Sequence, residues 1–200
     1  MNKTKPHSNA DYHLSAGEIA RLLAVQINLR DHLIIRTFVE TGMRRSELAD
    51  FDVSDIDWDR STVLVRNGKG GRQRVIPLRR SLLDDLRSLV GDRCEGSLFA
   101  SRSGGHLSPR QINRIVSAIG RSANVRSPNP NQSQVTPHLL RHSFARLWKA
   151  RRGSIETLSR ILGHTSVKTT WDLYGTEGIQ DVRRNYDSTI RKMFNVRRDR

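Results

Sequence analysis

Two histidines and an arginine are grouped in a segment that has helical periodicity and directly follows a proline. In His138-Leu-Leu-Arg-His142, the three polar side chains fall within about one helical turn. A guanidinium group has a planar set of N–H donors that matches phosphate oxygens, and imidazole moves protons near neutral pH. His138, Arg141 and His142 therefore predict a clamp for an anion. The alternative is a solvated polar face of the helix.

A zinc site is the other chemistry that histidines at positions i and i+4 suggest. The metalloprotease motif HExxH requires glutamate after the first histidine, and this chain has Leu139 there. Arg141 would repel a metal ion, and no third ligand is obvious in the sequence. The single cysteine, Cys94, excludes an internal disulfide and a cysteine-rich zinc site. We therefore expect no metal and no other cofactor.

A further histidine and a tyrosine follow in the last quarter of the chain. His164 comes directly after Gly163, which is expected to end a helix, and Tyr174 precedes another glycine. A tyrosine at the end of a helix before glycine is exposed and movable enough to reach a phosphate. The alternative is a core tyrosine that continues an apolar stripe with Val167 and Trp171.

Four separate segments resemble, in order and in spacing, the boxes of the tyrosine recombinases, the phage-integrase family. They are an arginine box at Thr41-Gly-Met-Arg-Arg-Ser-Glu-Leu48, a lysine hairpin at Asn67-Gly-Lys-Gly-Gly-Arg72, an H-x-x-R-H box at Pro137-His-Leu-Leu-Arg-His-Ser-Phe-Ala145, and Leu162-Gly-His-Thr-Ser-Val-Lys-Thr-Thr170 with Tyr174 beyond. One such box would be weak evidence, whereas four in register are strong evidence.

The resemblance implies six catalytic residues, each by its position in a box: Arg44, Lys69, His138, Arg141, His164 and Tyr174. Arg45 is a close rival of Arg44, although the box places the arginine directly after Gly-Met. His142 matches a family position that supports the site. Tyr174 lies ten residues after His164, where many members have nine, and the T-x-D-x-Y-G form resembles another branch of the family.

The mechanism that this resemblance implies joins the protein covalently to DNA. Tyr174 would attack a phosphodiester and form a 3′-phosphotyrosine with a free 5′ hydroxyl. The two arginines and His164 would hold the nonbridging oxygens by charge-assisted hydrogen bonds. Lys69 would protonate the departing 5′ oxygen, and His138 would assist proton transfer at the tyrosine. Rejoining to a partner strand gives site-specific recombination without ATP.

Two other functions remain open on the sequence alone. A type IB topoisomerase uses the same chemistry on one duplex and rejoins the original strand. A DNA-binding regulator would bind without cleaving, although a tyrosine nucleophile has no purpose in a simple binder. Formation of a covalent complex on nicked DNA separates the catalytic functions from the regulator.

The charge of the chain agrees with a nucleic-acid partner. The 200 residues include 35 Lys and Arg against 20 Asp and Glu, a formal net charge of +15. Such a surface attracts polyanions, chiefly double-stranded DNA. The sequence contains no long apolar run and no amphipathic lysine-rich anchor, so it does not predict a membrane partner. The N-terminus has no apolar signal region, so we expect a cytoplasmic protein.

Hydrophobic periodicity predicts one α+β, mainly α domain with a small antiparallel sheet. Helices are expected at about 15–27, 30–41, 46–48, 81–90, after Ser108-Pro109, 137–151, 154–163, 166–173 and 179–194, and strands at 56–58, 61–66 and 74–78. Residues 1–13 are expected to be a flexible segment and 14–200 the catalytic domain. Many members have a DNA-clamping domain before the catalytic one, but only about 14 residues precede the first expected helix here. We therefore expect the chain to resemble the short stand-alone recombinases, with a truncated or accessory form as the alternative.

The last predicted helix has an apolar stripe, which is formed by Ile179, Val182, Tyr186, Ile190 and Met193. In the tyrosine recombinase family that the chain resembles, such a C-terminal segment docks onto a neighbouring protomer, and four protomers hold two DNA sites. We therefore expect a homo-tetramer on DNA, and we expect a chain without residues 178–200 to fold but not to complete strand exchange. The alternative is that this stripe closes the core of its own chain.

Overall fold

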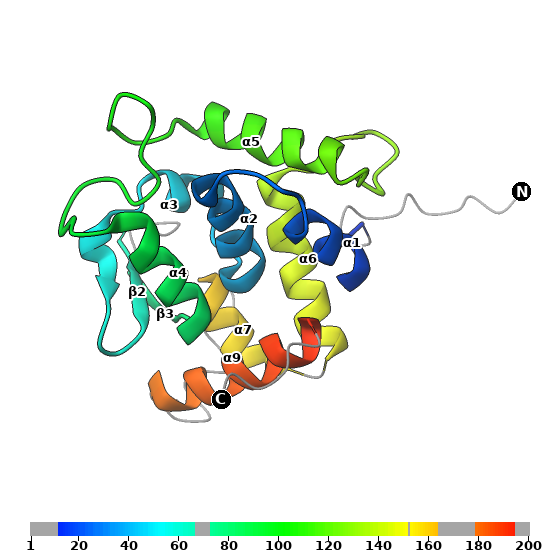
Figure 1. Cartoon of the computed structure of the whole chain (residues 1–200). Helices are drawn as coiled ribbons and strands as arrows, with labels where there is room; N and C mark the ends of the chain where they lie inside the picture. The colour runs from blue at the N-terminus through cyan, green and yellow to red at the C-terminus, as the bar shows by residue number, and fades with distance from the viewer. Residues whose placement is uncertain (1–11, 67–72, 152, 164–178, 195–200) are drawn as a thin grey trace, which may run out of the picture.

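The computed structural model describes residues 12–66, 73–151, 153–163 and 179–194 (Figure 1). The helices in this part are α1 (Ala16–Leu23), α2 (Leu29–Thr41), α3 (Arg45–Ala49), α4 (Arg80–Val90), α5 (Pro109–Ser122), α6 (Pro137–Ala150), α7 (Ile155–Leu162) and α9 (Ile179–Phe194). A short 3-10 helix, η2 (Val53–Asp55), precedes the sheet. None of these helices is long and apolar enough to cross a membrane.

The expected small antiparallel sheet is confirmed. Its strands, β1 (Ile56–Asp57), β2 (Thr62–Val65) and β3 (Arg74–Pro77), pair in the order β1-β2-β3. Val63 lies opposite Ile76, and both are buried, whereas Val75 on the other face is exposed. One face of the sheet therefore packs on the helices. The glycine-rich turn predicted at 67–71 lies outside the described residues.

Local sequence signals mark the starts of α1 and α5 and the ends of α2 and α7 as expected, whereas α1 ends at Leu23 and not at about residue 27. The Ser15 hydroxyl accepts from the backbone of Glu18 at 3.2 Å, and the Glu18 carboxylate accepts from the backbone of Ser15 at 2.8 Å. Ser108 caps α5 in the same way. Gly42 ends α2 at φ +63° and Gly163 ends α7 at φ +64°, a left-handed conformation that favours glycine.

The core is centred on α2 and α6, which pack against each other in the middle of the molecule (Figure 1). A row of aromatic rings leads from this contact to α9. The ring centroids of Phe144 and Trp148 are 5.7 Å apart, and those of Trp148 and Tyr186 are 6.5 Å apart. Such tilted pairs stabilise a core beyond the area that they bury. The C-terminal helix is thus part of the same core as α6.

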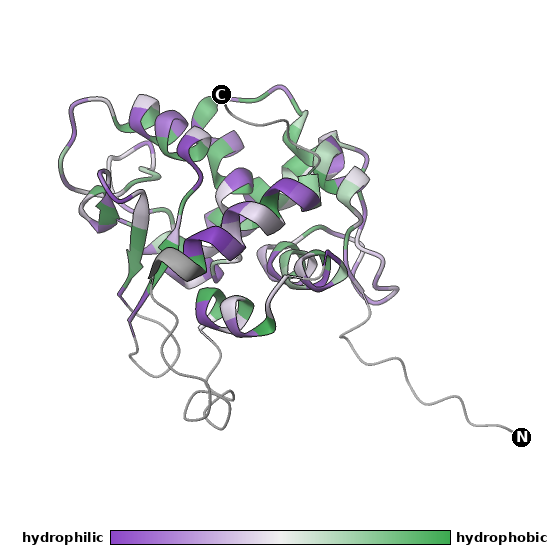
Figure 2. Ribbon diagram, turned by 90° about the horizontal axis from the view of Figure 1, so that it is seen from below, coloured by the Kyte–Doolittle hydropathy of each residue, from purple (hydrophilic) through white to green (hydrophobic). Residues whose placement is uncertain are grey.

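The proposed docking of the last apolar stripe onto a neighbouring protomer is wrong for the described side chains. Val182, Tyr186, Ile190 and Met193 are buried in this chain, where α9 packs against α1, α6, α7 and β3. The outward face of α9 is mostly hydrophilic (Figure 2). The sequence pattern requires only that the stripe be covered, and the nearest apolar surface belongs to the same chain. Because these side chains belong to the core of the chain, we now expect removal of residues 178–200 to destabilise the fold.

Replacing Ile190 with alanine should therefore destabilise the isolated chain. The side chain is fully buried, so its loss leaves a cavity and should cost about 3 kcal/mol. For a chain of this length we expect the melting temperature to fall by roughly 10 °C. Arg191→Ala, at an exposed position of the same helix, is the matched control and should shift it little. An unchanged melting temperature for Ile190→Ala would mean that the stripe serves another chain.

Candidate active site

Arg44, at the residue before α3, turns toward the end of α7. Its Nη1 donates to Oε1 of Glu47 at 2.7 Å, and its Nη2 lies 3.4 Å from the carbonyl oxygen of Gly163. Arg45, the first residue of α3, is exposed. Of the two rival arginines, Arg44 is therefore the one that joins a cluster with residues distant in the sequence.

Arg141 approaches the same place from the first half of α6 and is buried. Its Nη1 donates to the carbonyl of Gly42, and its Nη2 donates to the carbonyl of Leu162 at 2.7 Å. A Cβ on Gly42 would lie 2.6 Å from Cδ1 of Phe144 and 2.8 Å from Cδ2 of Leu162. Only glycine therefore lets the end of α2 pass this close to α6 and α7.

The C-terminal end of α7 is bound by three arginines. Its carbonyls at Ile161, Leu162 and Gly163 face Arg74, Arg141 and Arg44 respectively, and the Nε of Arg74 donates to Ile161 at 2.6 Å. The last carbonyls of a helix have no partner within the helix, and they form the negative end of its dipole. Cations are therefore favourable here, and α7 supplies a common anchor for three separate segments.

Glu47 is the carboxylate of this cluster, and its side chain is 1% exposed. It accepts from the backbone N–H of Arg44 at 2.7 Å, from the side chain of Arg44, and from both terminal nitrogens of Arg74 at 2.8 and 2.7 Å. Burial would raise the pKa of Glu47, but the hydrogen bonds and charge of Arg74, with those of Arg44, lower it to about 2. Glu47 is therefore ionised at neutral pH.

The electrostatics of the cluster are unfavourable for Arg141 in the absence of an anion. Burial, the charge of Arg44 and that of Arg74 lower the pKa of Arg141 to about 9, and Glu47 opposes this shift. The guanidinium group remains protonated at neutral pH all the same. A buried cation beside two like charges is stabilised by any anion that enters the site, so the arrangement suits a phosphate.

His138, Arg141 and His142 lie on neighbouring positions of α6, but they differ in burial, so the alternative of a solvated polar face does not hold for Arg141. His138 is exposed at the second position of the helix and His142 is half-buried, whereas Arg141 turns inward. The reason is the carbonyls of Gly42 and Leu162, which pair the guanidinium inside the protein. In the described ranges, no group of three or more His, Cys, Asp or Glu side chains is arranged to hold a metal ion.

Three of the six predicted catalytic residues, Lys69, His164 and Tyr174, lie outside the described residues. The structure brings Arg44 and Arg141 together and places His138 at the exposed start of the same helix as Arg141. Two residues of the cluster, Glu47 and Arg74, were not predicted. Glu47 lies three positions after Arg44 within the arginine box, which is a usable signal, but no local pattern marks Arg74.

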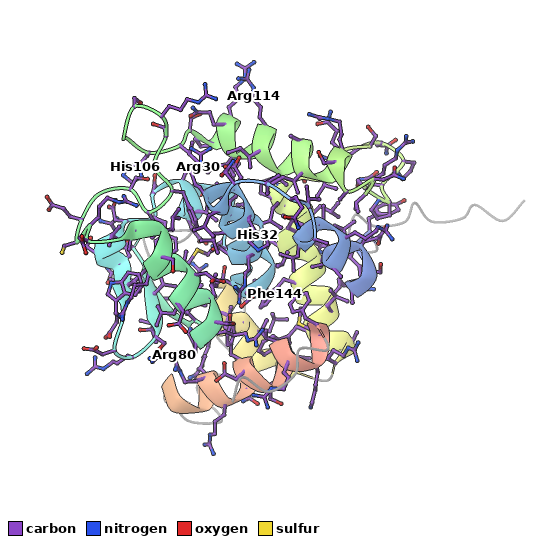
Figure 3. The ribbon with its side chains drawn as sticks, in the orientation of Figure 1. Arg30, His32, Arg80, His106, Arg114 and Phe144 are labelled. Carbon is purple, nitrogen blue, oxygen red and sulfur yellow. The ribbon has the colours of Figure 1, made fainter. Side chains whose placement is uncertain are left out.

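A basic groove runs along α5 beside the loop that leads into α6. It has a volume of about 480 Å³ and is lined by Arg110, Asn113, Arg114, Ser117 and Arg121 of α5 and by Gln132, Gln134 and Thr136. Thr136 caps the helix that contains Arg141. Arg114 extends outward from α5 (Figure 3). The groove therefore continues the basic surface from α5 toward the start of α6.

Comparison with known proteins places these features in a family. The model of the phage integrase family matches residues 13–177. The chain is 35% identical over 175 residues to the tyrosine recombinase XerA of Pyrococcus furiosus, covering 84% of this chain and 57% of that protein. It thus spans a little over half the length of this relative, and 54% of XerA of Pyrococcus horikoshii.

Solved structures share the fold. The integrase from mycobacterium phage Brujita superposes with a TM-score of 0.72 at 20% identity, over 94% of this chain and 59% of that one. XerH site-specific recombinase, in a pre-cleavage complex with its difH substrate, gives a TM-score of 0.62 at 26% identity, over 86% of this chain and 52% of that one. The family model covers most of the chain, and the chain belongs to the phage integrase family.

Proposed function

We propose that this chain cleaves and rejoins double-stranded DNA through a covalent bond between a DNA phosphate and Tyr174. It would act as a site-specific recombinase of the tyrosine type. The proposal is supported by the family of the chain and by relatives that are tyrosine recombinases. A structural neighbour of the same fold is a recombinase bound to its DNA substrate.

One observation supports this function above the others. Arg44 and Arg141 are nearly a hundred residues apart in the sequence, yet both reach the last carbonyls of α7, directly before His164. A site for phosphoryl transfer needs several cations around one phosphate, at positions fixed before the reaction begins. A protein that only binds DNA has no need to bury a guanidinium group for this purpose.

The proposed chemistry balances without an external energy source. The phenolic oxygen of Tyr174 attacks phosphorus, and the bond from phosphorus to the 5′ oxygen breaks. Arg44, Arg141 and His164 would neutralise the charge that develops on the nonbridging oxygens. Lys69 would give a proton to the 5′ oxygen, and His138 would assist removal of the phenolic proton. Attack by a 5′ hydroxyl on the phosphotyrosine reverses these steps and rejoins the DNA.

The groove along α5 is the surface that we propose for the flanking duplex. Arg110, Arg114 and Arg121 are exposed on one side of this helix, and the polar side chains of the neighbouring loop lie beside them. Arginine pairs with phosphate and with base edges, so a helix with this face suits DNA. The residues around Thr136 would continue the contact to the start of α6.

Recombination between two sites needs more than one copy of this chain. We propose that copies assemble on DNA as a homo-tetramer, with two sites held by four copies, and that residues 14–200 form the catalytic domain. The chain spans only part of its curated relatives, which agrees with a catalytic portion of a recombinase.

DNA binding should weaken with salt, and the α5 groove should account for part of this dependence. Each phosphate contact adds about 0.9 to the slope of log K against log salt. We expect the double variant Arg110→Gln/Arg114→Gln to bind a random duplex more weakly and with a slope that is smaller by one to two such contacts. Fluorescence anisotropy from low to high salt measures both quantities.

The matched control is Arg60→Gln/Arg80→Gln, which changes the net charge by the same amount. Both side chains are exposed, and Arg80 lies at the opposite end of the molecule from Arg114 (Figure 3). The control should keep most of the slope of the unchanged protein. Equal effects of the two double variants would show that only net charge matters.

Tyr174→Phe should abolish cleavage while DNA binding stays within about twofold. Only the phenolic oxygen is removed, and phenylalanine keeps the ring. The assay uses a suicide duplex with a nick near the cleavage point, so that the covalent protein–DNA adduct accumulates and is seen on a denaturing gel. Peptide mapping then identifies the attached residue in the unchanged protein.

The other two tyrosines serve as internal controls for this experiment. Tyr186 is fully buried in the core, and Tyr12 lies before α1, far in sequence from the four boxes. An adduct that persists in Tyr174→Phe, or one that maps to either of these residues, contradicts the assignment. Absence of any adduct in the unchanged protein contradicts the proposed function itself.

A further inference from the structure

Arg74, the first residue of β3, makes three strong contacts that join three parts of the fold. Its two terminal nitrogens bind the two oxygens of Glu47 at 2.8 and 2.7 Å, in the parallel geometry that arginine forms with a carboxylate. Its Nε donates to the carbonyl of Ile161 at 2.6 Å. The side chain is only 9% exposed. Arg74 therefore fixes the start of β3 to α3 and to the end of α7.

The contact between Arg74 and Glu47 also limits how far Glu47 compensates the positive charge of Arg44. Oε1 of Glu47 accepts from both arginines, at 2.7 Å from Arg44 and at 2.8 Å from Arg74. While Arg74 holds both carboxylate oxygens, Glu47 cannot turn to form a two-pronged pair with Arg44. The positive charge of Arg44 is then only partly compensated within the cluster, and it is available to another anion.

The aliphatic part of the Arg74 side chain also packs against Gly163, the residue before His164 in the sequence. A Cβ added to Gly163 would lie 2.9 Å from Cδ of Arg74 and 3.2 Å from its Nε. Gly163 is thus confined on one side by Arg74, while its carbonyl faces Arg44. The contacts of Arg74 with Ile161 and Gly163 therefore help to fix the last turn of α7 relative to Arg44 and Arg141.

We propose that Arg74 is a positioning residue for the phosphate clamp of Arg44 and Arg141. This inference rests on the proposed function, because it assigns a purpose to Arg74 within the same site. Arg74 does not itself touch the DNA. It holds Glu47 and the end of α7 so that the two clamp arginines keep their spacing and their charge as the transition state forms.

The test compares Arg74→Gln with the unchanged chain in single-turnover cleavage of the suicide duplex at saturating DNA. Misplacement of a clamp by about 1 Å slows a reaction by up to about a hundredfold. We expect cleavage to slow by roughly ten- to a hundredfold, with the Kd for DNA within about twofold. Arg74→Lys keeps the charge and loses the paired geometry, so it should give an intermediate rate. A normal rate in both variants overturns the proposal.

Arg36→Gln is the matched control for loss of a buried arginine. Arg36 on α2 also joins separate elements, since it donates to Glu40 at 2.7 Å, to Asp85, and to Ser81 of α4 at 2.7 Å. It makes these contacts away from the end of α7. We expect both this variant and Arg74→Gln to melt at a lower temperature, but we expect Arg36→Gln to cleave at the normal rate once the folded fraction is taken into account. Slowing equal to that of Arg74→Gln overturns the proposal.

A methylphosphonate at the cleaved position separates positioning of the clamp from a general structural effect. This substitution removes the negative charge of the nonbridging oxygens, which is the charge that the clamp neutralises. The difference between Arg74→Gln and the unchanged chain should therefore shrink, to below about threefold. An equal difference on the phosphate and the methylphosphonate overturns the role of Arg74. Absence of an adduct with the unchanged chain on the phosphate would instead contradict the proposed function.

Discussion

The exposed carbonyls at the end of α7 are the feature on which the candidate site depends. Ile161, Leu162 and Gly163 lie at the negative end of the helix, and each faces a guanidinium group from a different segment of the chain. No regular hydrogen-bond ladder joins α3, β3 and α6 to one another at this point. The helix end replaces such a ladder, because three successive acceptors fix three donors at spacings set by the helix itself.

Among the described residues, the same arrangement leaves the cluster with excess positive charge. Glu47 is the carboxylate of the cluster, and Arg44, Arg74 and Arg141 surround it, so it compensates only part of their charge. Burial, followed by the charges of Arg44 and Arg74, lowers the pKa of Arg141, so its charged guanidinium group is under electrostatic strain that Glu47 offsets only in part. A phosphodiester would relieve the strain, and a transition state with more charge on its oxygens would relieve it further. Under the proposed function, the fold would favour the charged transition state through an imbalance that is present before DNA binds.

The sequence predicted the structural features that neighbouring residues determine, such as helix ends. It did not predict the contacts between residues that are distant in the sequence. Ser15, Gly42 and Gly163 mark helix ends because capping and left-handed backbone are local properties. The pairing of Glu47 with Arg74 spans 27 residues, and no periodicity indicates it. The stripe of α9 shows the same limit, because an amphipathic pattern requires a covering surface without stating which chain provides it. Arg141 was placed on the correct helix, but its inward turn depends on carbonyls from α2 and α7.

Two glycines explain why these distant segments can meet. Gly42 lets α2 end within contact of Phe144 and Leu162, and its own carbonyl then accepts from Arg141. Gly163 ends α7 in the left-handed conformation and leaves room for the aliphatic part of the Arg74 side chain. A side chain at either position would clash and would also strain the backbone. The close packing that positions the arginines therefore requires both glycines. The placement of the positive charges in the site thus depends on two residues that have no side chain.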